Sequence, residues 1–118
     1  MATNMIVNPT LEPTVSFAGL TLVRGTSVEG DTIVFSGGTF PDAELTVEPA
    51  IEEGKTYRFA AEVVVTQGTL GVIPPGGSFT PLDANGVARF TALESGNKIQ
   101  IRGFSNTFAR VRAFDLTD

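Results

Sequence analysis

Acidic side chains are the groups in this chain whose type and spacing come nearest to catalytic chemistry. Glu44 and Glu48 fall on one face of a predicted strand, Glu52 and Glu53 are adjacent, and Asp42 lies close by. Two carboxyl groups can serve as acid and base, or as acid and nucleophile, in glycoside hydrolysis. Charged side chains on strand faces are, however, ordinarily solvated surface. We therefore expect no catalytic pair among them.

The chain contains no histidine and no cysteine. The absence of histidine removes the commonest general base near neutral pH and the usual partner of a Ser or Cys nucleophile. The absence of cysteine excludes disulfides and thiolate metal sites. Residues 25–30 hold two glycines five positions apart but lack the Lys-Ser/Thr pair that completes a phosphate-binding loop. The sequence therefore predicts a protein that is not an enzyme and carries no cofactor.

Residues 83–86, Asp-Ala-Asn-Gly, begin like a calcium-binding loop. They lack the further spaced acids and the closing Glu that an EF-hand needs. Asn-Gly is also a strong signal for a tight hairpin turn, because both residues tolerate positive φ. We expect the turn, and a structural calcium elsewhere in the chain stays open.

Four arginines are candidates for a binding face. Arg110 and Arg112 alternate with apolar residues, so both side chains project from the same face of the last predicted strand, and Arg58 and Arg102 have similar settings. If these strands are neighbours, the four form a cationic patch suited to a carboxylate-rich protein surface. The alternative is a solvated face of weak ion pairs with Glu62 and other acids.

Charge and hydropathy exclude two classes of partner. Thirteen acidic and eight basic residues give a net charge of -5, and no Lys/Arg run is present to neutralise phosphates. Nucleic acid is therefore not an expected partner. The N-terminus lacks the basic and apolar segments of a signal peptide, and no segment approaches about 20 continuous apolar residues. We expect a soluble protein, made in a cytoplasm, with no membrane partner.

The elements that must position these residues all have the period of β-strands. Residues 55–66 alternate most clearly, and one face of this run carries Tyr57, Phe59, Ala61, Val63 and Val65. Turn residues separate the apolar runs, and no helical repeat is found. About eight short strands at this spacing predict an all-β, antiparallel sandwich or barrel. The predicted strands are residues 19–24, 31–36, 44–48, 55–66, 69–73, 86–92, 98–103 and 108–116.

Two segments are irregular. Residues 1–16 contain Asn8-Pro9 and Glu12-Pro13, which favour extended geometry and predict an N-terminal arm or edge segment ahead of a single domain over 17–118. Residues 73–81 hold three prolines and two glycines and predict a long loop of the kind that contacts partners.

The chain has nine Phe, one Tyr and no Trp. The Phe residues within apolar alternation are expected in the core, and those beside turns are expected to be exposed. The first group is Phe17, Phe35, Phe59, Phe90 and Phe104; the second is Phe40, Phe79 and Phe108.

Three stretches together resemble a known group of domains. The opening Asn-Met-Ile-Val-Asn-Pro-Thr-Leu-Glu over residues 4–12, Gly-Lys-Thr-Tyr-Arg-Phe over 54–59, and the final run over 104–116 are similar to carbohydrate-binding-module or galactose-binding-like jelly rolls. The resemblance implies a jelly-roll-like sandwich and a structural calcium near Glu12 and Asp115. It specifies a fold far better than a ligand.

Small stand-alone domains of this type are similar to bacteriophage virion proteins, in particular capsid decoration (cement) proteins. That resemblance implies a homotrimer on the virion exterior, assembled in the host cytoplasm, that bridges and stabilises major capsid protein subunits. The alternative is a glycan-binding accessory, tail or fibre domain. Contacts are expected from the N-terminal arm (Met5, Ile6, Val7, Leu11), the Pro-rich loop (Ile73, Pro74, Pro75, Phe79) and the Arg face (Arg58, Arg102, Arg110, Arg112).

Overall fold

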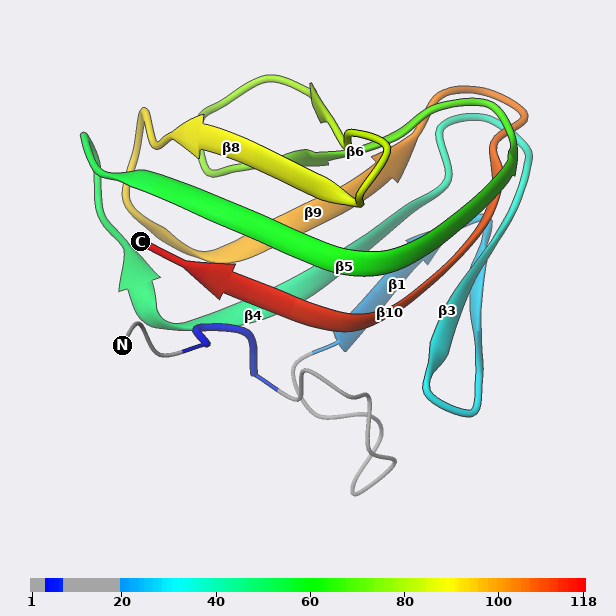
Figure 1. Ribbon diagram of the computed structural model, residues 1–118, viewed down its shortest axis with the longest axis horizontal. Coiled ribbons are helices and arrows are strands. Elements are labelled where there is room, and N and C mark those ends of the chain that lie inside the picture. Colours follow the sequence, from blue (N-terminus) through cyan, green and yellow to red (C-terminus); the bar gives the residue numbers. More distant parts are fainter. Residues whose placement is uncertain (1–3, 8–19) are drawn as a thin grey trace.

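The computed structural model describes residues 4–7 and 20–118, and the latter fold into two antiparallel sheets packed face to face (Figure 1). One sheet, called here the β4 sheet, has the order β1-β4-β9-β6-β7, and the other, the β5 sheet, has the order β2-β3-β10-β5-β8. The strands are β1 (Leu20–Arg24), β2 (Thr26–Glu29), β3 (Thr32–Ser36), β4 (Asp42–Ile51), β5 (Thr56–Gln67), β6 (Leu70–Ile73), β7 (Thr80–Pro81), β8 (Val87–Thr91), β9 (Gly96–Gly103) and β10 (Phe108–Thr117).

The core lies between the sheets and is built from the alternate residues of each strand. Phe35, Phe59 and Phe114 of the β5 sheet face Leu45 and Ile101 of the β4 sheet, and all five side chains are buried. Each contributes roughly 1.5–3 kcal/mol through burial of apolar surface. Because successive strand residues point to opposite faces, this inner set fixes which polar side chains stand on the two outer faces.

The predicted antiparallel β-sandwich is confirmed. Each of the eight predicted runs contains a strand, and β2 and β7 are additional. The glycine-flanked segment that was compared with a phosphate loop is β2, which pairs with β3. No helix among the described residues is long and apolar enough to cross a membrane.

Residues 4–7 connect β10 of one sheet with β4 of the other, beyond the parts of these strands that β3 and β1 pair with. The Met5 amide donates to the carbonyl of Leu116 on β10, and Ile6 forms a bridge with Val47 on β4. The Asn4 Oδ1 atom accepts hydrogen bonds from the amides of Ile6 and Leu116, both at 3.1 Å. Residues 4–7 are therefore bonded to both sheets, whereas the rest of the predicted arm or edge segment and the predicted domain boundary fall outside the described residues.

The β3–β4, β5–β6 and β9–β10 connections meet at one end of the sandwich, at the upper right in Figure 1. The β3–β4 and β9–β10 loops are joined by bonds from the Gly37 amide to the Thr107 carbonyl (2.9 Å) and from the Asn106 amide to the Gly38 carbonyl (2.8 Å). Gly37 has φ of +83°, and a Cβ there would lie 2.6 Å from the Phe108 ring. Glycine is required at this position because both the φ angle and the close ring exclude a side chain.

Candidate functional site

A row of outward side chains crosses three strands of the β4 sheet. Glu44 on β4 is registered with Gln100 on β9, which is registered with Ile73 on β6. With Asn97 and Lys98 they line a hollow of about 330 Å3 that ends against the Pro-rich loop. This volume lies at the lower end of the range of roughly 300–1,000 Å3 typical of small-ligand sites.

The Pro-rich loop forms a rigid wall on this hollow. The Gly77 amide donates to the Pro74 carbonyl at 3.0 Å, and Gly76 has φ of +66°. Pro at the second position and a positive-φ Gly at the third are the requirements of a type II turn. The Pro75 ring also packs on Gly96, where an added Cβ would lie 2.9 Å from Pro75 Cγ. The wall is therefore held in one shape without a ligand.

The polar groups in the hollow are not bonded to other described residues. No side-chain hydrogen bond or ion pair between described residues involves Glu44, Asn97, Lys98 or Gln100. Glu44 offers acceptors, Lys98 offers donors, and the two amides offer both. The hollow therefore combines polar groups that no other described residue bonds with the apolar surface of Ile73 and Pro75, whereas Pro74 is buried. Ile73, Pro74 and Pro75 were predicted contact residues, whereas the polar residues were not.

The outer face of the β5 sheet differs, because two of its arginines, Arg110 and Arg112, are already paired. Arg110 Nη2 lies 3.3 Å from Glu29 Oε1, and Arg112 lies 2.9 Å from Asp31 Oδ2 and 3.5 Å from Glu62 Oε2. Two shallow hollows of about 540 and 290 Å3 flank this network and share Val64 and Arg110. The solvated ion-pair alternative therefore describes Arg110 and Arg112.

Arg102 does not belong to an arginine face of four, and that part of the prediction is wrong. It lies on β9 of the β4 sheet, whereas Arg58, Arg110 and Arg112 lie on β5 and β10. Arg102 Nη2 is 3.0 Å from Oδ2 of Asp42, a carboxylate that is only 1% exposed. The Arg102 guanidinium is therefore committed to a buried partner.

Met5 and Ile6 were expected to contact a partner, but both are buried, at 6% and 4% exposed. Their side chains pack in the core and offer nothing to a partner in this fold. Val7 is half-buried and donates its amide to the Thr46 carbonyl. Leu11 lies outside the described residues, so its predicted contact stays a prediction.

Aromatic rings are exposed mainly at the end where the loops meet. Phe40 and Phe108 are exposed, as predicted, and Phe79 is half-buried. Phe104 was expected in the core, but it is 47% exposed and stacks on Phe79 with ring centroids 4.6 Å apart. Phe104 lies just past the end of β9, so the alternation of strand residues that would place its side chain in the core does not apply to it. Tyr57 is buried, and its hydroxyl accepts a hydrogen bond from the Glu52 amide.

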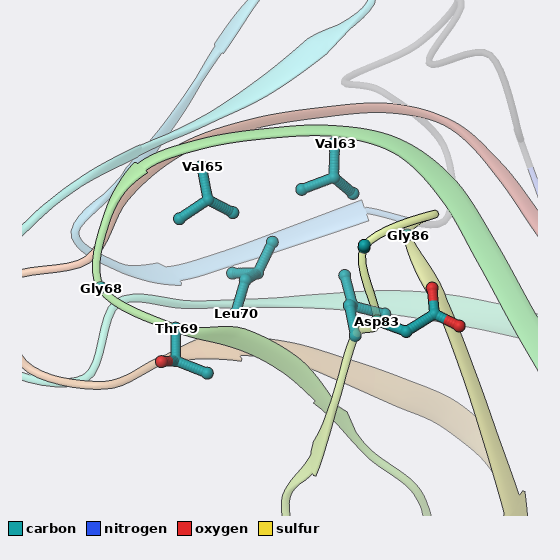
Figure 2. Close-up of a pocket in the computed structure, with 9 residues that line it drawn as sticks. Val63, Val65, Gly68, Thr69, Leu70, Asp83 and Gly86 are labelled. Carbon is teal, nitrogen blue, oxygen red and sulfur yellow. The ribbon is translucent and has the colours of Figure 1, made fainter.

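A cleft of about 360 Å3 opens between the sheets beside β5. Figure 2 shows Val63 and Val65 pointing from β5 toward Leu70 of β6. The nearby Asp83 carboxylate is committed to its turn, because Oδ1 accepts from the amides of Asn85 (2.8 Å) and Val87 (3.0 Å). A tight turn is therefore present, with Gly86 at φ of +76°, but the expected hairpin is wrong in two respects: Asn85 does not have positive φ, and the turn connects β7 and β8, which belong to different sheets. Thr69 and Asp83 carry the polar side chains that line the cleft, fewer than the four in the hollow on the β4 sheet.

Metal binding has no further support within the described residues. They contain no group of three or more acidic side chains placed to hold a metal ion. Asp115 is half-buried on β10, and Glu12 lies outside the described residues. The predicted calcium site between them is therefore untested.

Comparison with known proteins finds a distant structural likeness. No protein-family model matches the chain, and no curated protein matches it. Among solved structures it is similar to TmCBM61, a carbohydrate-binding module solved in complex with beta-1,4-galactotriose, at 14% sequence identity and a TM-score of 0.42. The alignment covers 97% of each chain. At this identity and TM-score the likeness assigns no ligand to the present chain.

Proposed function

We propose that this domain is a non-catalytic glycan-binding module that holds a neutral oligosaccharide over the Glu44–Gln100–Ile73 row. The observation that carries the proposal is the set of unbonded polar groups in a hollow with a rigid wall. Sugar hydroxyls both donate and accept hydrogen bonds, so they match a carboxylate, an ammonium and two amides placed together. The C–H faces of a sugar ring would pack on the half-buried Ile73 and Pro75.

The hollow is suited to binding more than to hydrolysis. Glu44 is the one carboxylate among the described residues that line it. Glycoside hydrolysis by the usual routes needs a second carboxyl group about 5–10 Å away, placed across the scissile bond. Glu44 therefore acts as a hydrogen-bond acceptor that orients the sugar.

The test is a glycan array followed by calorimetry with the best ligand. We expect Gln100→Ala to lower the affinity about tenfold, because an amide bonded to ligand is worth about 1–1.5 kcal/mol. Gln67→Ala is the matched control: the same change on an exposed glutamine outside the hollow, whose Nε2 bonds the Asn106 carbonyl. Equal affinity of Gln100→Ala and wild type would refute the proposed site, and absence of binding on a broad array would refute the proposed function.

A second candidate is a phage capsid decoration protein that binds major capsid protein on the virion exterior as a homotrimer. It is favoured by the exposed Phe40, Phe104 and Phe108 rings, which are carried by hydrogen-bonded loops at one end of the sandwich. Exposed rings on a firm base are typical of protein interfaces. Co-sedimentation with undecorated phage capsids, lost in a Phe40→Ser/Phe104→Ser variant, is the expected result. No co-sedimentation of the wild-type protein would rule this candidate out.

A further inference from the structure

Two arginines stand directly opposite each other on the β5 sheet. Arg58 on β5 is registered with Arg89 on β8. Their neighbours Phe59 and Phe90 point into the core, so both arginines point to the outer face, where both are exposed. Sequence analysis named Arg58 but not Arg89, since only the strand register brings them together.

This placement is unfavourable for the isolated domain. Directly opposed side chains in an antiparallel pair have Cβ atoms about 4.5–5.5 Å apart, and like charges there destabilise the sheet. The chain has thirteen acidic residues. Yet none within the described residues lies within 4.0 Å of either guanidinium, although Arg110 and Arg112 on the adjacent strand have acidic partners. The cationic pair is therefore uncompensated.

Two acidic residues near the C-terminal end of β10 lie close to the pair in the strand register. Asp118 follows Thr117, the residue registered with Arg58, and forms no ion pair with Arg58 or Arg89. Asp115 of β10 is registered with Ala60, one row along from Arg58, and forms no ion pair with it. Lys55, which directly precedes β5, forms an ion pair with Glu52, with its Nζ atom 2.9 Å from Oε2. The positive charge of the two arginines is thus available to a group from outside the domain.

Hydroxyl groups border the two arginines on both sides. Thr117 lies on β10, the neighbour of β5 on the side opposite β8, and is registered with Arg58. In the next row Thr56 and Thr91 lie opposite each other, with their Oγ1 atoms 3.0 Å apart. Guanidinium groups bind oxyanions through paired N–H donors, and neighbouring hydroxyls add further donors.

We propose that Arg58 and Arg89 together form a binding site for an oxyanion, with the hydroxyls of Thr56, Thr91 and Thr117 at its border. The ligand is a carboxylate, sulfate or phosphate group held between the two guanidinium groups. Binding removes their mutual repulsion, so the domain is more stable with the anion than without it. The site lies on the β5 sheet and is independent of the hollow proposed for a glycan.

The thermal midpoint of unfolding, measured in sodium sulfate and in sodium chloride at equal ionic strength, tests this site. In chloride, Arg89→Gln should unfold about 1–5 °C higher than the wild type, because the repulsion is gone. Replacing chloride by sulfate should raise the thermal midpoint of the wild type by more than it raises that of Arg89→Gln or Arg58→Gln. Sulfate also stabilises proteins by exclusion from their surface, and that gain is common to all variants. Arg112→Gln, on an arginine that already has two acidic partners, is the matched control and should keep the full wild-type gain.

Titrations followed by backbone amide resonances distinguish the source of the anion. Inorganic sulfate and a glutamate-rich peptide are added separately, and shifts are expected at residues 56–58, 89–91 and 117. Shifts with sulfate indicate a small or ester-linked anion, and shifts with the peptide alone indicate carboxylates of a protein partner. The proposal is overturned if the sulfate gain is the same in wild type, Arg58→Gln and Arg89→Gln, and neither probe shifts these resonances.

Discussion

The outer faces of the two sheets differ in what their polar side chains already bond. On the β5 sheet, Arg110 and Arg112 are paired with acids of β2, β5 and the β2–β3 turn. In the hollow of the β4 sheet, Glu44 and Lys98 make no ion pair with a described residue. Binding potential therefore follows from uncommitted donors and acceptors beside a fixed wall, and not from charge alone.

The β4 sheet keeps its own strong ion pair at the far end of the same face. Asp42 is registered with Arg102, and the pair lies one row beyond Glu44 and Gln100. Arg24 Nη2 also reaches to 3.9 Å of the Asp42 carboxylate. The face is thus divided into a closed, buried ion pair and an open hollow, and the two parts respond differently to substitution.

The largest expected effect is on the buried carboxylate. Asp42→Ala should lower the free energy of unfolding by about 2 kcal/mol, because Arg102 loses its partner but keeps some access to water; a fully buried pair would cost about 3–5 kcal/mol. Glu62→Ala, which removes an exposed partner of Arg112 on the β5 sheet, should cost less than about 1 kcal/mol. Urea unfolding measures both. Equal losses would show that the two faces do not differ as described.

The next effect concerns the wall of the hollow. Gly76→Ala places a side chain at φ of +66° and brings Cβ to 2.5 Å from Cγ of Glu94. The strain should cost about 1 kcal/mol and displace Pro74 and Pro75. Calorimetry with the array-selected glycan should show weaker binding by this variant. Gly54→Ala has a similar φ but an open surrounding, so it should lose similar stability without losing affinity. Unchanged affinity in Gly76→Ala would show that the wall does not contribute.

The smallest expected effect is on the stacked rings. Phe104→Ala should destabilise the domain by about 1 kcal/mol, since the pair with Phe79 is worth about 0.5–1.5 kcal/mol and the ring is partly exposed. Thermal unfolding measures the change. The rings lie outside the hollow, so glycan affinity should stay the same. A tenfold loss of affinity would extend the binding surface from the hollow to this end of the molecule.

Much of the fold follows from alternation in the sequence. Period two placed Tyr57, Phe59, Ala61, Val63 and Val65 on one face; the first three are buried, whereas Val63 is half-buried and Val65 is 41% exposed. β7 was missed because it has two residues, one of them Pro81. β2 was missed because it carries one apolar residue between two glycines and so lacks a clear period.

The candidate site was harder to predict, because it depends on which strands are neighbours. Glu44, Ile73 and Gln100 are far apart in the sequence and form a row only through the register of β4, β9 and β6. Arg102 and Arg110 have the same local alternation but lie on different sheets. The Pro-rich loop was predictable because its turn is encoded by four consecutive residues, Pro74 to Gly77.

The most direct test of the glycan site is a titration of isotope-labelled protein with the best array ligand, followed by backbone amide shifts. The account predicts that shifts concentrate at residues 44, 73–77 and 96–100, and that they are reduced in Gln100→Ala and kept in Gln67→Ala. Shifts centred on residues 62–66 and 108–112 of the β5 sheet would contradict it.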